Sequence, residues 1–168
     1  MKRLSQITIE RFDVLLEEPY TVAYGTFDRE FGYLVTVTDT DGDTGVGLGT
    51  PCDEAHDSPS IAMDVITTLS FTDAPACLSP QFFYNDFLRQ LPSPAIRCAF
   101  DIAMWDLAGK QARVPTYRLF NGDPYRPKPN SVTVCLKPTL AATAAEARRI
   151  VETYPHLRVM KIKLNGDG

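Results

Sequence analysis

Two lysines near the end of the sequence are spaced so that their side chains could act together in one chemical site. Lys161 and Lys163 lie two residues apart within an apolar stretch, residues 159–164. Residues two apart on a β-strand point to the same face, so both side chains are expected to project into one space. The nearly continuous apolar run is typical of a strand covered on both sides. Burial and a neighbouring ammonium group both favour the neutral amine, so one of the lysines could accept a proton near neutral pH.

The same motif has a second interpretation. Edge strands often carry solvated lysines, which protect the edge against aggregation. The motif alone does not decide between a buried base and a protected edge. The choice between these two interpretations depends on the composition of the chain and on the elements around the lysine strand.

The composition is that of a globular protein. The 168 residues are 44% hydrophobic, and 17 basic against 21 acidic residues give a net charge of −4, with no cationic block. This balance argues against a nucleic-acid partner. The N-terminus lacks the apolar segment of a signal peptide, and no apolar run approaches about 18 residues, so we expect a cytoplasmic protein with no membrane partner. The four cysteines are widely scattered, which favours free thiols.

The first 50 residues predict a three-stranded antiparallel meander. Apolar and polar residues alternate around Ile7 and Ile9 and again from Tyr33 to Val37. A turn at residues 39–42 leads into a third strand, residues 44–48. Residues 17–30, between the first two strands, are predicted to form a long loop, and loops of this length in compact domains are often functional.

Three Ser-Pro pairs, Ser58-Pro59, Ser79-Pro80 and Ser93-Pro94, predict three helix starts, with serine as the N-cap and proline in the first turn. The third helix has a broad apolar stripe from Ile96 to Ala108 and is expected to end before Val114-Pro115. Three further residues of this helix, Asp101, Trp105 and Asp106, could belong to a site. We interpret the two acids as capped or solvated side chains and the indole of Trp105 as packed.

From residue 126 the pattern changes to that of a βαβ unit. A proline-containing linker (126–130) precedes a strand (131–136), a helix (about 139–152) and the lysine strand (158–165). Two parallel strands and one helix cannot bury both faces of their sheet, so further strands are expected outside these residues.

This order of elements resembles the enolase superfamily, and three motifs make the resemblance specific. Residues 94–110 and 114–122 are similar to the last capping-domain helix of the muconate lactonizing subgroup, and Lys161-Ile-Lys163 matches its Lys-x-Lys on the second barrel strand. Residues 38–47 resemble its hairpin, although Leu48 stands where the family commonly has Glu. The resemblance implies an α+β capping domain (1–125) followed by the start of a (β/α)8 barrel domain (126–168), with the barrel incomplete in this chain.

Residues 130–134, including Thr133, are most similar to dipeptide epimerases. The resemblance implies an isomerase that removes the proton α to a carboxylate, with Lys163 as the base and Lys161 beside it, facing the substrate carboxylate. Mg²⁺ would stabilise the resulting enediolate. The metal ligands and a second lysine are expected beyond residue 168, so no metal ligand is assigned within the segment, and the segment alone is expected to be inactive.

In the family, two capping-domain loops close over the barrel mouth and select the substrate; residues 17–30 and 50–57 correspond to them. Phe27 is a candidate apolar wall, Arg29 a candidate partner for an acidic substrate group, and Thr133 a candidate contact for a substrate amide. The expected partner is a small carboxylate, most simply a dipeptide, and we expect a homo-oligomer.

Several alternatives remain open at this stage. N-acylamino-acid racemase, o-succinylbenzoate synthase and muconate cycloisomerase share the same base and metal but differ in outcome. An alternative of another class is a non-catalytic binding module, if the chain truly ends at residue 168; such a module would have to cover its unpaired strand edge.

Overall fold

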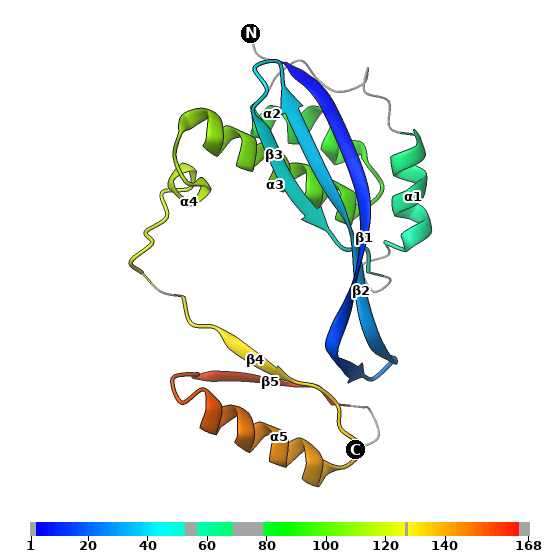
Figure 1. Cartoon of the computed structure of the whole chain (residues 1–168), viewed down its shortest axis with the longest axis vertical. Coiled ribbons are helices and arrows are strands. Elements are labelled where there is room, and N and C mark those ends of the chain that lie inside the picture. Colours follow the sequence, from blue (N-terminus) through cyan, green and yellow to red (C-terminus); the bar gives the residue numbers. More distant parts are fainter. Residues whose placement is uncertain (1–2, 53–56, 69–78, 127, 165–168) are drawn as a thin grey trace. The chain divides into compact units, whose positions relative to one another are not determined.

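The structure of the chain, a computed structural model, describes residues 3–52, 57–68, 79–126 and 128–164. The chain forms two compact units. Unit 1 comprises Met1–Asp13 and Phe31–Asp123, and unit 2 comprises Val14–Glu30 and Pro124–Gly168. The two long N-terminal strands run through both units (Figure 1).

The predicted antiparallel meander is confirmed. Strands β1 (Leu4–Val22), β2 (Gly25–Asp39) and β3 (Thr44–Gly49) form a sheet in the order β1-β2-β3. β2 and β3 pair antiparallel, with Tyr33 opposite Gly49 and Thr38 opposite Thr44. The turn between β2 and β3 is closed by Asp39, whose Oδ1 accepts hydrogen bonds from the backbone N–H groups of Asp41 and Asp43.

The long loop predicted for residues 17–30 is wrong. β1 continues to Val22 and β2 begins at Gly25, so the two strands are joined by a two-residue turn. Cross-strand pairs explain the extension. The Thr21 and Thr26 hydroxyls are 2.9 Å apart, and the Tyr20 and Phe27 rings stack. Such pairs stabilise adjacent strands. The sequence pattern of residues 17–30 shows only polar and aromatic residues and does not reveal these pairs.

Three helices of unit 1 begin at the predicted Ser-Pro pairs: α1 (Pro59–Thr68), α2 (Pro80–Asp86) and α3 (Pro94–Ala112). Unit 1 also contains a 3₁₀ turn, η3 (Leu88–Gln90), and a short helix, α4 (Thr116–Leu119). The caps differ in detail. Ser93 Oγ accepts a hydrogen bond from the Ile96 N–H, whereas Ser79 makes no side-chain cap bond. α3 ends at Ala112, as expected from Val114-Pro115, with Arg113 in the left-handed region.

The core of unit 1 lies between the sheet and α3. Tyr33, Val35 and Val37 on β2 are buried, and the apolar stripe of α3 is buried along its length, with Ile96, Ala99, Phe100, Ala103, Met104 and Leu107 at 1% exposure or less. α3 lies against one face of the sheet (Figure 1). β3 contributes glycines at Gly45, Gly47 and Gly49, which allow the backbone of α3 to approach the strand directly.

α3 is also held to β3 by a polar contact that the sequence interpretation missed. The Asp106 Oδ2 atom accepts a 2.9 Å hydrogen bond from the Val46 N–H and a 2.8 Å hydrogen bond from Lys110 Nζ. Lys110 Nζ also donates to the Thr44 carbonyl. Asp106 is therefore a bridge between helix and strand, not a solvated acid.

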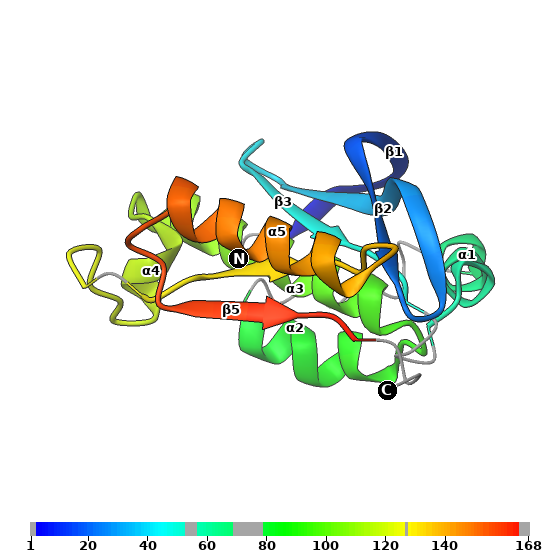
Figure 2. The ribbon, with the colours of Figure 1, turned by 90° about the horizontal axis from the view of Figure 1, so that it is seen from below.

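Unit 2 contains the predicted βαβ arrangement. β4 (Ser131–Val134) and β5 (Val159–Ile162) pair parallel, and α5 (Leu140–Thr153) connects them. Thr139 caps α5, because its Oγ1 accepts from the Ala142 N–H. α5 lies along one face of the two strands (Figure 2). Among the helices of the described residues, none has the length and apolar character needed to cross a membrane.

Candidate active-site residues

The register of the parallel strands brings Thr133 and Lys161 together. Thr133 lies directly opposite Lys161 in the β4–β5 pairing, so these two residues occupy the same face of the sheet. The pairing continues past the end of β5, since the Lys163 N–H donates a 2.9 Å hydrogen bond to the Val134 carbonyl. Because this hydrogen bond keeps Lys163 in line with β5, its side chain is expected on the same face as that of Lys161, two residues away.

The lysine strand is more exposed than the sequence predicted. Within the described residues, Val159 and Ile162 are about half exposed and Leu164 is 74% exposed, and Lys161 is exposed while Lys163 is half-buried. The expectation of a strand covered on both faces is therefore wrong for this chain. The reason is the composition of unit 2. One helix can cover only one face of the β4–β5 pair, and the buried apolar residues described in unit 2 are Val22, Val134 and Ile150.

The tip of the β1–β2 hairpin, defined here as residues 14–30, is bound to the end of β4. The Leu136 N–H, two residues beyond β4, donates a 3.0 Å hydrogen bond to the Thr21 carbonyl of the tip. The carboxyl ends of parallel strands lie at the same edge of a sheet. The hairpin tip therefore lies at the edge where β4 and β5 end, which is also where Lys163 is found.

Three aromatic rings, those of Tyr20, Tyr24 and Phe27, pack together in the hairpin tip. The Phe27 ring stacks on Tyr20 at a centroid distance of 5.3 Å and an interplanar angle of 22°, and it meets the edge of Tyr24 at 5.9 Å. Phe27 is half-buried, so part of its ring remains accessible. The predicted apolar wall is thus one member of an aromatic cluster.

A short hydrogen bond braces this cluster. The Tyr20 hydroxyl donates to Glu30 Oε1 at 2.5 Å. This bond to Glu30, assisted by burial, raises the pKa of Tyr20 to about 12. The sequence analysis missed the pair, because the contact between residues ten apart follows only from the two-residue turn that joins β1 and β2.

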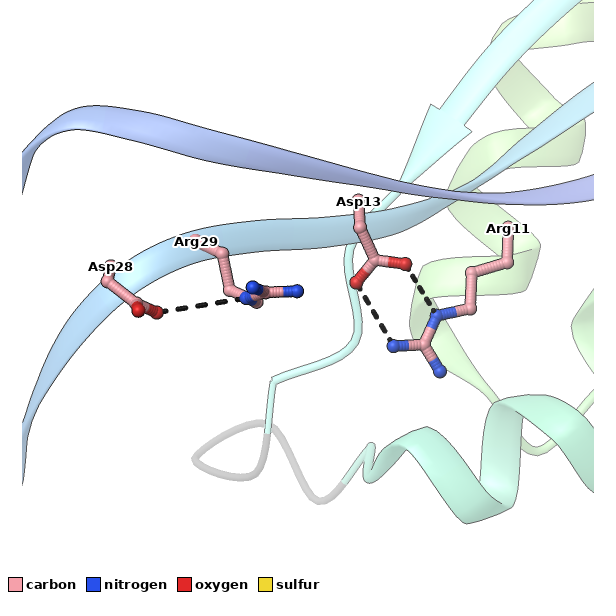
Figure 3. Close-up of polar contacts among 4 residues, drawn as sticks. All are labelled: Arg11, Asp13, Asp28 and Arg29. Atoms are coloured by element: carbon pink, nitrogen blue, oxygen red, sulfur yellow. Dashed lines mark hydrogen bonds and ion pairs between the residues drawn. The ribbon is translucent and has the colours of Figure 1, made fainter.

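Arg29 lies on the exposed surface of the tip beside an acid of its own strand. Its Nε is 3.8 Å from Asp28 Oδ1, and both side chains are more than half exposed (Figure 3). In unit 1, Arg11 forms a two-bond ion pair with Asp13 at 3.1 and 3.2 Å, also drawn in Figure 3. An exposed pair such as Arg29–Asp28 contributes little to stability, so the Arg29 guanidinium remains accessible to another anion.

The second predicted specificity segment, residues 50–57, is described only at its ends, because residues 53–56 lie outside the described part of the chain. Its far end is firmly anchored. The buried Asp57 Oδ2 accepts hydrogen bonds from Ser93 Oγ at 3.1 Å and from the Ala95 N–H at 2.6 Å. Asp57 thereby caps the N-terminus of α3, where a negative charge is favourable. No sequence signal links residues so far apart.

A metal site does not emerge from the residues that the structure describes. Among them, no group of three or more His, Cys, Asp or Glu side chains could hold a metal ion. The described residues therefore do not supply the ligands that Mg²⁺ needs.

Known proteins resemble this chain over nearly its whole length. It is 30% identical, over 169 aligned residues, to an L-Lys-D/L-Arg epimerase from Desulforapulum autotrophicum; the match covers 97% of this chain and 47% of that protein. No family model matches the chain.

Solved structures share its fold. The dipeptide epimerase from Methylococcus capsulatus, complexed with Mg and the dipeptide L-Arg-D-Lys, superposes with a TM-score of 0.78 and 24% identity, over 98% of this chain and 47% of the other. The muconate lactonizing enzyme from Pseudomonas fluorescens, complexed with muconolactone, superposes with a TM-score of 0.82 and 19% identity, over 99% and 46%.

The chain spans about half the length of the curated relative and of both solved structures. In sequence and in fold, the chain is similar to the N-terminal half of these enzymes, and this likeness agrees with the resemblance of its motifs to the enolase superfamily.

Proposed function

We propose that this chain is the N-terminal part of a dipeptide epimerase, an isomerase that removes and returns the proton α to a carboxylate. The observation that carries the proposal is the shared face of Thr133, Lys161 and Lys163 at the edge where β4 and β5 end. The 30% identity to an L-Lys-D/L-Arg epimerase supports the choice among reactions. As part of this proposal, residues 1–125 form the capping domain and residues 126–168 begin the barrel domain.

In this proposal each lysine has a separate role. Lys163, half-buried at the end of β5, takes the α-proton on one side of the substrate. Lys161, on the same face, donates hydrogen bonds to the substrate carboxylate and stabilises the negative charge that develops when the proton leaves. Thr133, opposite Lys161, can donate a hydrogen bond to a substrate amide through its hydroxyl.

We extend the Mg²⁺ requirement to this protein because the Methylococcus capsulatus epimerase was solved with Mg. The described residues offer no ligand cluster. As the family resemblance implies, the metal ligands and the second base on the opposite side of the substrate would lie beyond residue 168.

The hairpin tip carries the substrate preference in this proposal. Phe27 offers an accessible ring, and the tip has four carboxylates against one guanidinium: Glu17, Glu18, Asp28, Glu30 and Arg29. This excess of negative charge favours dipeptides with cationic side chains. Arg29 is the group that would instead pair with an acidic side chain, and its accessibility keeps that pairing open.

The test is exchange of the α-proton for deuterium, measured by NMR in D₂O with Mg²⁺ on the natively produced protein. Pools of cationic, acidic and apolar dipeptides, an N-acylamino acid and muconate would distinguish the related reactions. Exchange with dipeptides, strongest in the cationic pool, is expected.

The decisive variant is Lys163→Ala, which should reduce exchange by a factor of about 10² or more. Lys128→Ala removes an exposed lysine of the linker and serves as the matched control, expected to leave exchange unchanged. Exchange that survives Lys163→Ala, or activity with muconate alone, would overturn the assignment.

A further inference from the structure

A pocket of about 280 Å³ lies in unit 1 among α2, α3 and the end of α4. Its lining consists of aromatic rings, one carboxylate and two further side chains: Tyr84, Trp105, Phe120, Asp101, Gln81 and Pro80. All of these residues belong to unit 1, and none was singled out as a site residue by the sequence. The volume suits a ligand of only a few heavy atoms.

The aromatic part of the lining comes from three different elements. Trp105 on α3 packs against Phe120, which follows α4, with ring centroids 4.5 Å apart and planes at 51°. Tyr84 comes from α2. Tyr84 and Phe120 are exposed, and Trp105 is half-buried. Exposed aromatic rings around a small hollow are unusual for packing alone, because burying them would be favourable.

The charged part of the lining is a single acid. Asp101 is half-buried and lies on α3, four residues before Trp105. Burial raises the pKa of Asp101 above its usual range, and a hydrogen-bonding interaction with Trp105 partly opposes the rise. Among the described residues, no lysine, arginine or histidine side chain forms an ion pair with it. Asp101 is thus a partly desolvated carboxylate with no cationic partner in the part of the chain that the structure describes.

We propose that this pocket binds a small organic cation, an alkylated ammonium group, between the aromatic rings and Asp101. The faces of Trp and Tyr rings attract cations, and they do so best when the cation is weakly hydrated. A methylated ammonium is weakly hydrated and cannot be held by hydrogen bonds alone, so rings and a carboxylate together are its complementary surroundings. An anion would be repelled by Asp101, and a neutral apolar group would leave the carboxylate uncompensated.

The position of Trp105 supplies a direct assay. It is the only tryptophan in the chain, so fluorescence excited at the red edge of the absorption, where tyrosine does not absorb, reports on this pocket. The full chain would be titrated with choline at constant ionic strength, using sodium chloride to balance the salt. We expect a saturable change in Trp105 emission with a Kd on the order of 1 mM, as befits so small a ligand.

A neutral analogue separates charge from shape. In 3,3-dimethylbutan-1-ol a carbon replaces the choline nitrogen, so size and form are kept while the charge is lost. We expect it to bind at least about tenfold more weakly than choline. If the neutral alcohol binds as well as choline, the pocket recognises apolar shape and the proposal is overturned. Absence of any saturable response to choline overturns it as well.

Two variants test the named groups. Asp101→Asn should weaken choline binding about tenfold or more, whereas Asp86→Asn makes the same change of charge on an exposed residue of α2 that does not line the pocket, and it should have no effect. Phe120→Leu keeps apolar bulk and removes one ring; because Phe120 is 58% exposed, the fold should survive this change. It should weaken choline binding several-fold while leaving binding of the neutral alcohol unchanged. Equal effects of Asp101→Asn and Asp86→Asn would contradict the assignment.

Discussion

The contact between β3 and α3 makes a sharp prediction about Gly47. A Cβ atom added at Gly47 would lie 1.9 Å from the Ala99 carbonyl oxygen and 2.7 Å from the Ala103 nitrogen. Both are backbone atoms of α3, so no side chain can rotate away to make room. The first distance falls about 1.5 Å short of ordinary contact, and α3 must move by a comparable amount to accept even one methyl group.

The cost follows from what such a shift would separate. α3 buries four large apolar side chains, Ile96, Phe100, Met104 and Leu107, each at 1% exposure or less. Burial of each contributes roughly 1.5–3 kcal/mol, and a gap of 0.5–1 Å already removes a quarter to a half of the packing attraction. Gly47→Ala should therefore destabilise unit 1 by about 3 kcal/mol, a large share of the roughly 5–15 kcal/mol typical of a domain.

The assay is urea unfolding followed by the fluorescence of Trp105, which lies on α3 itself. With a slope of about 1.5 kcal/mol/M, the expected loss lowers the midpoint by about 2 M. Val46→Ala is the matched control, because Val46 is the neighbouring residue on the exposed side of β3 and both variants place an alanine on this strand. It should cost less than about 1 kcal/mol. If the two variants unfold at similar urea concentrations, α3 does not lie directly on β3 and the packing argument is refuted.

Two further predictions concern polar anchors. Asp57→Ala removes the buried carboxylate that accepts a hydrogen bond from the Ala95 N–H, so we expect urea unfolding to show a stability about 2–3 kcal/mol lower. The exposed residue Asp86 is the control, and Asp86→Ala should leave the stability almost unchanged. Equal midpoints for the two variants would contradict the capping role. For Tyr20, whose hydrogen bond to Glu30 raises its pKa to about 12, the stabilisation is complete below pH 10 and is lost as the pH rises through 12. Absorbance titration of the phenolates should show a late step that Tyr20→Phe abolishes and Glu30→Gln moves to lower pH; a late step that persists in Tyr20→Phe would assign it to another tyrosine.

The features that the sequence predicted correctly are those encoded locally. Each Ser-Pro pair marks a helix start, because the cap and the fixed proline backbone act within one turn. The apolar stripe of α3 is likewise a property of one helix, and its residues are buried as its period indicated.

The features that it did not predict depend on distant partners. Residues 17–30 are strand because Tyr20 meets Phe27 and Thr21 meets Thr26 across a turn. Asp57 is buried because it reaches Ser93, 36 residues away. The exposure of β5 was mispredicted for a related reason, since an apolar strand pattern reports what a strand can bury and not which neighbours are present.

The way the hairpin tip is attached leaves its exposed side chains free to vary. The Thr21 carbonyl and the Leu136 N–H are both main-chain groups, so their hydrogen bond survives almost any substitution at either residue. The Tyr20–Glu30 hydrogen bond and the Tyr20–Phe27 stack then fix the shape of the tip from within. Exposed side chains such as Arg29 carry neither task, and can therefore be exchanged without moving the tip away from the end of β4. In the proposed epimerase, residues that are free to vary would thus select the substrate side chain, while the lysines stay on strands whose position is set by main-chain bonds.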